Sequence, residues 1–190
     1  MILPIARYNE PVLRKKGTPV REFDDDLKRL FDDMVETMYN AEGIGLAAQQ
    51  IGRDTQFCVI DLRGPDMAFR WELDGRRDLP LDLIMPLGIA NPDVTILPAE
   101  RIVYEEGCLS FPEIRGEVER PSRVSLRYQD LSGKPHTLEC DGLLARCVLH
   151  EIDHLHGVLF IDRMDKKTLK RIDPKLKELK RRTRKSQPSR

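Results

Sequence analysis

The feature that most constrains the fold is a stretch from Gly142 to about Leu155 that is apolar on nearly every side. Its apolar residues are Leu143, Leu144, Ala145, Cys147, Val148, Leu149, Ile152 and Leu155. A helix without a polar face cannot lie on a protein surface, so this stretch predicts a buried helix around which the chain packs. Asp141 is placed to cap the start of the helix, and Gly157 is placed to end it.

Within that helix lies the sequence His150-Glu151-Ile-Asp-His154. Positions i and i+4 lie one turn apart on one helix face, so both imidazoles can reach a single metal ion. Two histidines in an apolar helix also need polar partners, which a metal supplies. Two unrelated core histidines are the alternative, but only four histidines occur in 190 residues, so this spacing is rare by chance. Glu151 lies beside the pair and can exchange protons with an activated water.

The third metal ligand is expected upstream of the helix. The extended metzincin pattern needs a histidine at position 160, where this chain has Phe160. A thermolysin-like site needs a downstream glutamate, but Glu178 lies in a run of Lys and Arg and is expected to be a surface residue. Cys108, within Glu106–Ser110, is the best candidate, because glycine and serine suit a turn that presents a thiolate. Cys147 is a rival, although we expect it to line the pocket beside the metal. A Cys-His-His set leaves a fourth position open, which is a catalytic arrangement.

A second unusual segment, Gly43-Ile-Gly-Leu-Ala-Ala-Gln-Gln50, follows a predicted surface helix. It is not a dinucleotide-binding fingerprint, because the third glycine is missing and a helix precedes it. Small residues let the backbone approach a ligand or another strand. The amide of Gln50 could then donate a hydrogen bond to a developing oxyanion. A tight helix-to-strand turn is the alternative, to which we give about equal weight.

The remaining elements give an α+β chain. Three aspartates followed by apolar residues at helical spacing predict a surface helix at 24–40. Strands are expected at 56–62, 89–90, 94–97 and 101–104, a β-hairpin at 124–140, and a second helix at about 166–184. Residues 63–83, which include the only tryptophan, predict a long loop or a small hairpin.

Several classes of protein are excluded. No apolar run approaches the ~20 residues of a membrane span, and the start of the chain resembles neither a signal peptide nor a transit peptide. The four cysteines, Cys58, Cys108, Cys140 and Cys147, contain no C-x-x-C pair, which favours free thiols in a reducing compartment. We therefore expect a cytoplasmic protein of one domain.

Three motifs in this order resemble the peptide deformylase family. The family pattern G-x-G-x-A-A-x-Q fits Gly43–Gln50, E-G-C-x-S fits Glu106–Ser110, and H-E-x-x-H fits His150–His154. The resemblance extends over about residues 3–165. It implies antiparallel β-sheets packed around a central metal-binding helix, followed by a basic C-terminal helix.

The resemblance also implies an iron-dependent hydrolase that removes the formyl group from the initiator methionine of nascent polypeptides. We expect a monomer. Cys108, His150 and His154 would bind Fe²⁺, for which Zn²⁺ or Ni²⁺ can substitute. A metal-bound water would attack the formyl carbonyl, with Glu151 as general base and then general acid.

The other implied roles concern the substrate. The Gln50 amide and the Leu109 backbone N–H would stabilise the oxyanion. Ile44 and Gly45 would hold the peptide backbone in an extended form. The pocket for the methionine side chain would include Leu143 and Cys147.

The chain departs from the family pattern in places. The stretch 63–83 is longer than expected, so an inserted loop could border the cleft. Arg146 stands where an aliphatic pocket residue is more usual, so the family pattern does not predict what forms the outer wall of the pocket. Asp153 is expected to pair with Arg115 or Arg120, or else to be polar surface. Two other functions remain as alternatives: another H-E-x-x-H hydrolase such as a peptidase, and a binding module with a structural metal.

The formal net charge of zero is a cancellation between two unlike parts. Residues 166–190 hold twelve Lys and Arg against two Asp and Glu, a charge of +10, so 20 basic and 30 acidic residues leave 1–165 with −10. We therefore divide the chain into a catalytic domain, 1–165, and a basic tail, 166–190. The tail has a thin apolar seam that Pro174 is expected to break. A solvated face is one interpretation of this charge, and docking on ribosomal RNA is the other.

Overall fold

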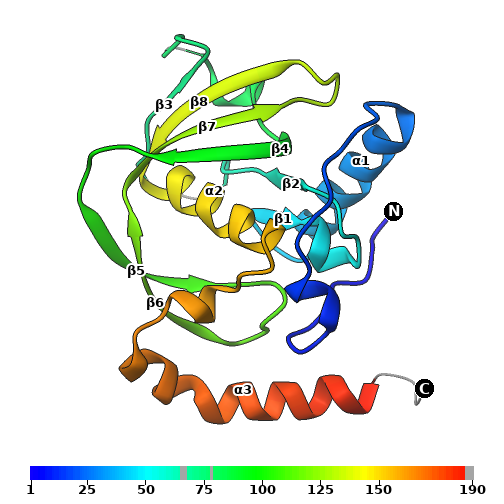
Figure 1. Ribbon diagram of the computed structural model, residues 1–190, viewed down its shortest axis with the longest axis vertical. Helices are drawn as coiled ribbons and strands as arrows, with labels where there is room; N and C mark the ends of the chain where they lie inside the picture. Colours follow the sequence, from blue (N-terminus) through cyan, green and yellow to red (C-terminus); the bar gives the residue numbers. More distant parts are fainter. Residues whose placement is uncertain (65–67, 78, 187–190) are drawn as a thin grey trace.

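The computed structural model describes residues 1–64, 68–77 and 79–186. At its centre lies α2 (Gly142–Leu155), which has the predicted bounds and is held between a larger and a smaller β-sheet (Figure 1). Leu144, Val148 and Leu155 are fully buried in the core beneath the larger sheet. The prediction that Asp141 caps this helix is wrong. Its side chain makes no cap hydrogen bond and instead accepts the N–H of Arg70 at 2.6 Å.

The larger sheet has six antiparallel strands in the order β1-β2-β4-β7-β8-β3. They are β1 (Gly45–Ala47), β2 (Phe57–Ile60), β4 (Leu87–Ile96), β7 (Arg123–Gln129), β8 (Pro135–Asp141) and β3 (Trp71–Leu73). The predicted hairpin is confirmed as β7 and β8, which pair in register along their whole length. The predicted strands 89–90 and 94–97 are one strand, β4. Its register shifts between Ala90 and Asp93, where Asn91 adopts a left-handed φ of 50°.

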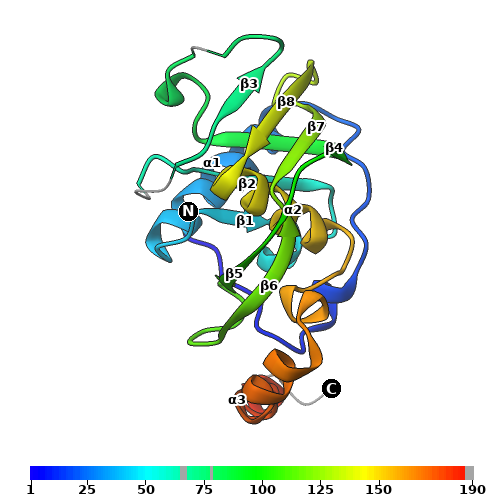
Figure 2. The same ribbon diagram turned by 90° about the vertical axis from the view of Figure 1, so that its left-hand side faces the viewer.

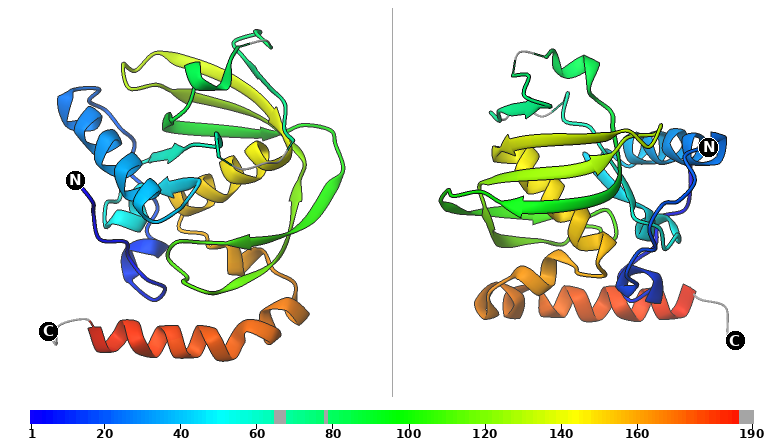
Figure 3. Two further views of the ribbon diagram at one scale, coloured as in Figure 1. Left: turned by 180° about the vertical axis from the view of Figure 1, so that it is seen from behind. Right: turned by 45° about the horizontal axis from the view of Figure 1, so that its top comes forward.

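Successive side chains of β2 point to opposite faces of the larger sheet, and both faces are buried. Phe57 and Val59 pack with α1 (Asp25–Asn40), whereas Cys58 and Ile60 pack in the core around α2. Because successive strand residues point to opposite faces, one strand joins both cores. Figure 3 shows α1 on the outer side of β1 and β2, away from α2. The predicted surface helix is therefore confirmed.

The segment 63–83 joins the far edge of the larger sheet. Trp71 pairs with Cys140 and Leu73 with Leu138, which makes β3 an edge strand, and a 3-10 turn follows at Leu81–Leu83. Residues 65–67 and 78 lie outside the described residues. None of the described residues of 63–83 lines the groove that contains the candidate site.

The smaller sheet consists of β5 (Arg101–Gly107) and β6 (Arg115–Pro121). The helix α3 (Lys166–Ser186) lies beneath β6 (Figures 1 and 2) and buries Ile172 and Leu176. The short 3-10 segments are Pro11–Arg14, Ala48–Ile51 and Phe160–Arg163.

The prediction that Pro174 breaks the C-terminal helix is wrong, because α3 runs through it. Pro174 is exposed, so its ring and the backbone carbonyl left without a partner face water instead of the core. Residues 187–190, at the end of the predicted tail, lie outside the described residues. Within the described ranges, none of the helices is both long and apolar enough to cross a membrane.

Candidate metal centre

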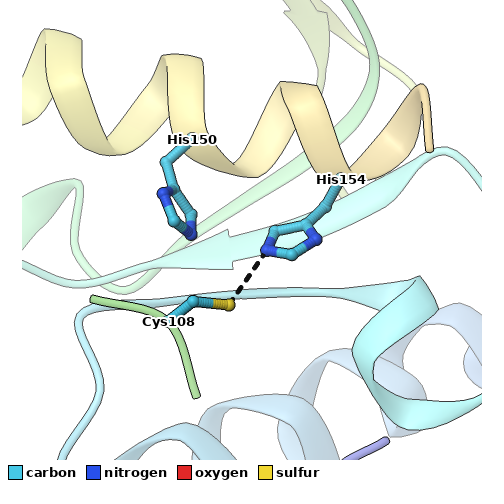
Figure 4. Close-up of side chains that lie close together, drawn as sticks. All are labelled: Cys108, His150 and His154. Atoms are coloured by element: carbon cyan, nitrogen blue, oxygen red, sulfur yellow. Dashed lines mark hydrogen bonds between the residues drawn. The ribbon is translucent and has the colours of Figure 1, made fainter. Parts of the chain in front are cut away.

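Three metal-ligating side chains converge from two parts of the fold (Figure 4). Cys108 directly follows β5, and His150 and His154 lie one turn apart on α2. Their ligand atoms all lie within 4.8 Å of one another, and Cys108 Sγ is 3.3 Å from His154 Nε2. Cys147, the rival ligand, lies outside this cluster, and its thiol is directed at the carbonyl oxygen of Ile44 at 3.6 Å.

The orientation of His150 is set by a buried carboxylate. Its Nδ1 lies 3.1 Å from Oε2 of Glu106, so the other ring nitrogen faces Cys108 (Figure 4). Arg120 holds the same carboxylate in a fork, through Nε at 2.7 Å and Nη2 at 3.0 Å. Burial by itself raises the pKa of Glu106, but the hydrogen bonds from His150 and Arg120 outweigh it and bring the pKa to about 2. Glu106 is therefore ionised whenever it holds His150.

This network extends along α2. Arg120 Nη1 also donates to Asp153 at 2.8 Å, so Arg120 is one of the two partners predicted for Asp153. The second partner is Arg163, at 2.7 Å, rather than Arg115. The sequence analysis missed the role of Glu106. Its position at the end of β5, two residues before Cys108, was the available signal, because alternate residues of an extended chain share a face.

Glu151 is buried beside the cluster with an unpartnered oxygen. Its residue is 3% exposed, and its Oε2 has no hydrogen-bond partner within the described residues. Burial raises its pKa to about 7 against the lowering effect of His150 and Arg120. Gly45 leaves the room that this carboxylate occupies, since a Cβ at residue 45 would lie 2.3 Å from Oε1. Glu151 can thus both accept and return a proton near neutral pH.

Gln50 is oriented by its neighbours. Its Oε1 accepts the backbone N–H of Ala47 at 2.8 Å, which fixes the direction of the amide. Its Nε2 then lies 3.5 Å from Cys108 Sγ and 3.3 Å from Ser110 Oγ. Leu109 follows Cys108 directly, and its carbonyl accepts a hydrogen bond from Arg7 at 2.6 Å.

The donor set fits a transition-metal ion. A thiolate and two imidazoles are ligands that such ions prefer. Burial lowers the pKa of His154, which keeps it in the neutral form that binds metals. Burial also lowers the pKa of His150, but hydrogen bonds with Cys108 and Glu106 outweigh this and raise it to about 10. A position that stabilises positive charge so strongly is suited to a cation.

The cluster opens into a groove of about 710 Å³. The groove brings together the residues that were predicted to act on the substrate: Ile44, Gly45, Gln50, Leu109, Leu143, Cys147, His150 and Glu151. His154 lies deeper, 1% exposed. Arg7, Tyr104 and Arg146 also line the groove, and the sequence analysis had assigned no role to the first two.

The site has the features of a metal-dependent hydrolase, because three side chains that could hold a metal ion lie beside an open groove, with a buried acid next to them. Comparison with known proteins is more specific. The sequence model of the family described as polypeptide deformylase matches residues 2–170. The chain therefore belongs to the peptide deformylase family, metal-dependent hydrolases that remove the formyl group from nascent peptides. This confirms the resemblance shown by the three motifs and supports deformylation over the peptidase alternative.

Individual relatives agree with this assignment. A peptide deformylase from Opitutus terrae is 59% identical over 181 residues, covering 94% of this chain and 93% of that protein. One from Rhizobium meliloti is 48% identical over 165 residues, covering 87% and 86%. Among solved structures, a Plasmodium falciparum peptide deformylase in complex with an inhibitor has a TM-score of 0.78 and 37% identity, covering 93% of this chain and 99% of the other. The Thermotoga maritima peptide deformylase has a TM-score of 0.74 and 39% identity, covering 87% and 99%.

Proposed function

We propose that Cys108, His150 and His154 hold the metal of this deformylase, and that the ion is Fe²⁺, with Zn²⁺ or Ni²⁺ as substitutes. The observation that carries the proposal is the convergence of these three donors within 4.8 Å beside the unpartnered carboxylate oxygen of Glu151. A bound ion supplies Lewis-acid activation of water and of the formyl oxygen.

Glu151 moves the proton in this proposal. As general base it accepts a proton from the attacking water, and as general acid it passes that proton to the leaving amine. Its pKa of about 7 suits both steps, because the group must be ionised in the first and protonated in the second. Its carboxylate is positioned by close packing against Gly45.

The oxyanion is stabilised by two N–H donors. Gln50 directs Nε2 toward the space beside Cys108, because its Oε1 is bound to the Ala47 backbone. The second donor in this proposal is the backbone N–H of Leu109, the residue that follows Cys108 and lines the groove. Donors that are already oriented need no rearrangement as charge develops on the substrate oxygen.

The groove holds an extended peptide. β1 is the end strand of the larger sheet, so Ile44 and Gly45 lie where an added strand can form backbone hydrogen bonds. The methionine side chain enters between β5 and α2, against Leu143 and Cys147. Both residues line the groove, seven and three residues before His150 on the helix.

Formate release tests this proposal directly. Protein purified without oxygen and loaded with Fe²⁺ should release formate from a formyl-Met-Ala-Ser peptide and leave unformylated Met-Ala-Ser intact. Glu151→Gln should abolish turnover while metal content stays at the wild-type level, and Cys108→Ala should lose metal and activity together. Fully loaded wild-type protein without formate release would contradict the proposed function. Full activity of Glu151→Gln would contradict its role alone.

We further propose that residues 1–165 carry catalysis and that 166–190 dock on ribosomal RNA, in a monomeric cytoplasmic enzyme. α3 turns Ile172 and Leu176 inward. Its outward face carries exposed basic residues without an ion-pair partner within the described residues: Lys166, Lys167, Lys170, Lys175, Arg184 and Lys185.

Charge reversal is a better test of docking than deletion, because deletion would expose the core that Ile172 and Leu176 cover. Lys170→Glu combined with Lys175→Glu should weaken ribosome binding and reduce its dependence on salt, without changing turnover of small peptides. Lys28→Glu combined with Arg53→Glu, both exposed and far from α3 in sequence, is the matched control. Equal ribosome binding by the two double variants would refute docking through α3.

A further inference from the structure

Arg146 makes an unusual set of contacts for a residue of a substrate groove. It lies on α2, is 9% exposed, and lines the groove together with Leu143 and Cys147. Its Nη1 donates to Glu106 at 2.6 Å and to the carbonyl of Val118 at 3.0 Å, and its Nη2 donates to the carbonyl of Ile102 at 2.6 Å. One buried guanidinium thus connects α2 to β5 and to β6.

The strand β5 has few other means of attachment to the helix. It is one strand of a two-stranded sheet, and its residues Arg101–Glu105 are all exposed. A strand with so little buried side-chain area is held mainly by its backbone hydrogen bonds to β6. The bond from Arg146 to the carbonyl of Ile102 therefore restrains the distance between β5 and α2.

That distance is also the width of the side-chain pocket. Tyr104 lies two residues after Ile102, and its ring faces the Arg146 guanidinium, with Cζ 5.6 Å from the ring centre. A planar cation over an aromatic face is a favourable arrangement that positions both groups. Tyr104 lines the groove from β5, and Leu143, Arg146 and Cys147 line it from α2, so the distance between strand and helix sets the width of the groove.

We propose that Arg146 is a specificity-determining residue, which keeps the pocket narrow by fixing β5 and Tyr104 against α2. A pocket of fixed width accepts the slender, unbranched side chain of methionine and rejects broader ones such as phenylalanine. This inference rests on the proposed function and names the basis of side-chain selection at that same groove.

The metal ligands do not depend on Arg146 in this proposal. Glu106 keeps the two hydrogen bonds from Arg120 when Arg146 is replaced, so its carboxylate remains paired and continues to hold His150. Loss of Arg146 should therefore change which side chain is accepted more than it changes the reaction.

The test measures a ratio of substrates on metal-loaded enzyme. For Arg146→Met, the ratio of kcat/KM for formyl-Met-Ala-Ser to that for formyl-Phe-Ala-Ser should fall at least tenfold. A purely structural defect would lower kcat/KM for both substrates by the same factor and leave the ratio unchanged. Arg146→Lys should behave like Arg146→Met, because a lysine keeps the charge but cannot bridge the two carbonyls.

Two further variants complete the experiment. Arg163→Gln removes an arginine from the same charge network but outside the groove, and should keep the wild-type ratio. Tyr104→Ala, at an exposed position, should also lower the ratio, and it serves if Arg146→Met does not fold. A ratio within twofold of the wild-type ratio in Arg146→Met would overturn the inference. If Arg146→Met is unfolded, the same result in Tyr104→Ala would overturn it. Wild-type selectivity in Arg146→Lys would overturn it as well. A wild type inactive on the methionine peptide would instead contradict the proposed function.

Discussion

Replacement of Gly45 by alanine should impair turnover through the position of Glu151. The new Cβ would lie 2.3 Å from Oε1 and 2.8 Å from Cδ of that carboxylate. Non-bonded heavy atoms rest at about 3.5 Å, so the carboxylate must retreat by about 1 Å. A displacement of that size at a reacting group costs about 100-fold in rate. Forcing a methyl group into this packed region should also lower the free energy of unfolding by about 1–3 kcal/mol.

The assay is formate release by metal-loaded enzyme, with metal content and Tm measured on the same samples. We expect kcat of Gly45→Ala to fall about 100-fold while metal content is unchanged, since the substitution touches none of the three ligands. Gly64→Ala is the matched control, because a Cβ there meets nothing within 4 Å. In a Glu151→Gln background, Gly45→Ala should add little, because both act on the same step. Wild-type kcat in Gly45→Ala would refute the reasoning.

Two other predictions concern the charged groups. Glu106→Gln removes the negative charge that pairs with His150 and leaves Arg120 buried without this counter-ion. Metal affinity should fall about 10–100-fold, measured by metal titration, and the free energy of unfolding should fall by about 3–5 kcal/mol, measured by urea unfolding. Wild-type values for both would contradict this role. Burial lowers the pKa of His136, but hydrogen bonds with Asp74 and Asp130 outweigh it and raise the pKa. This contribution to stability is complete below the ordinary pKa of about 6.5 and is lost as pH rises through the raised value. The difference in Tm between wild type and His136→Gln should therefore shrink from pH 6 to pH 9, and a constant difference would count against the ion pairs.

The elements that the sequence predicted best are those whose structure depends on local pattern. The stretch 142–155 has apolar residues on nearly every side, which predicted a buried helix. Gly157, just beyond its end, has a left-handed φ of 71°, a conformation that glycine adopts readily. Cys108 could be singled out because the downstream ligand positions were unsuitable. The convergence of Cys108 with His150 and His154 agrees with that argument.

The errors arose where distant residues compete for a local role. Asp141 stands at a good cap position, but the N–H of Arg70, brought alongside by β3 pairing with β8, takes its carboxylate. Pro174 would break an isolated helix, yet burial of Ile172 and Leu176 on either side maintains α3. The partners of Arg146 lie 28 to 44 residues away along the chain, so no local pattern could reveal its role.

The three proposed metal ligands come from two parts of the fold, which has a consequence for folding. His150 and His154 lie one turn apart as soon as α2 forms, whereas Cys108, which directly follows β5, reaches them only when the smaller sheet has docked on the helix. Contacts between residues so far apart in sequence form late, because ordering the intervening chain costs entropy before the contacts can stabilise the structure. Tight three-ligand metal binding is therefore a marker of completed assembly: a folding intermediate with α2 formed and β5 undocked would hold the ion through two imidazoles only, and would release it readily to a chelator.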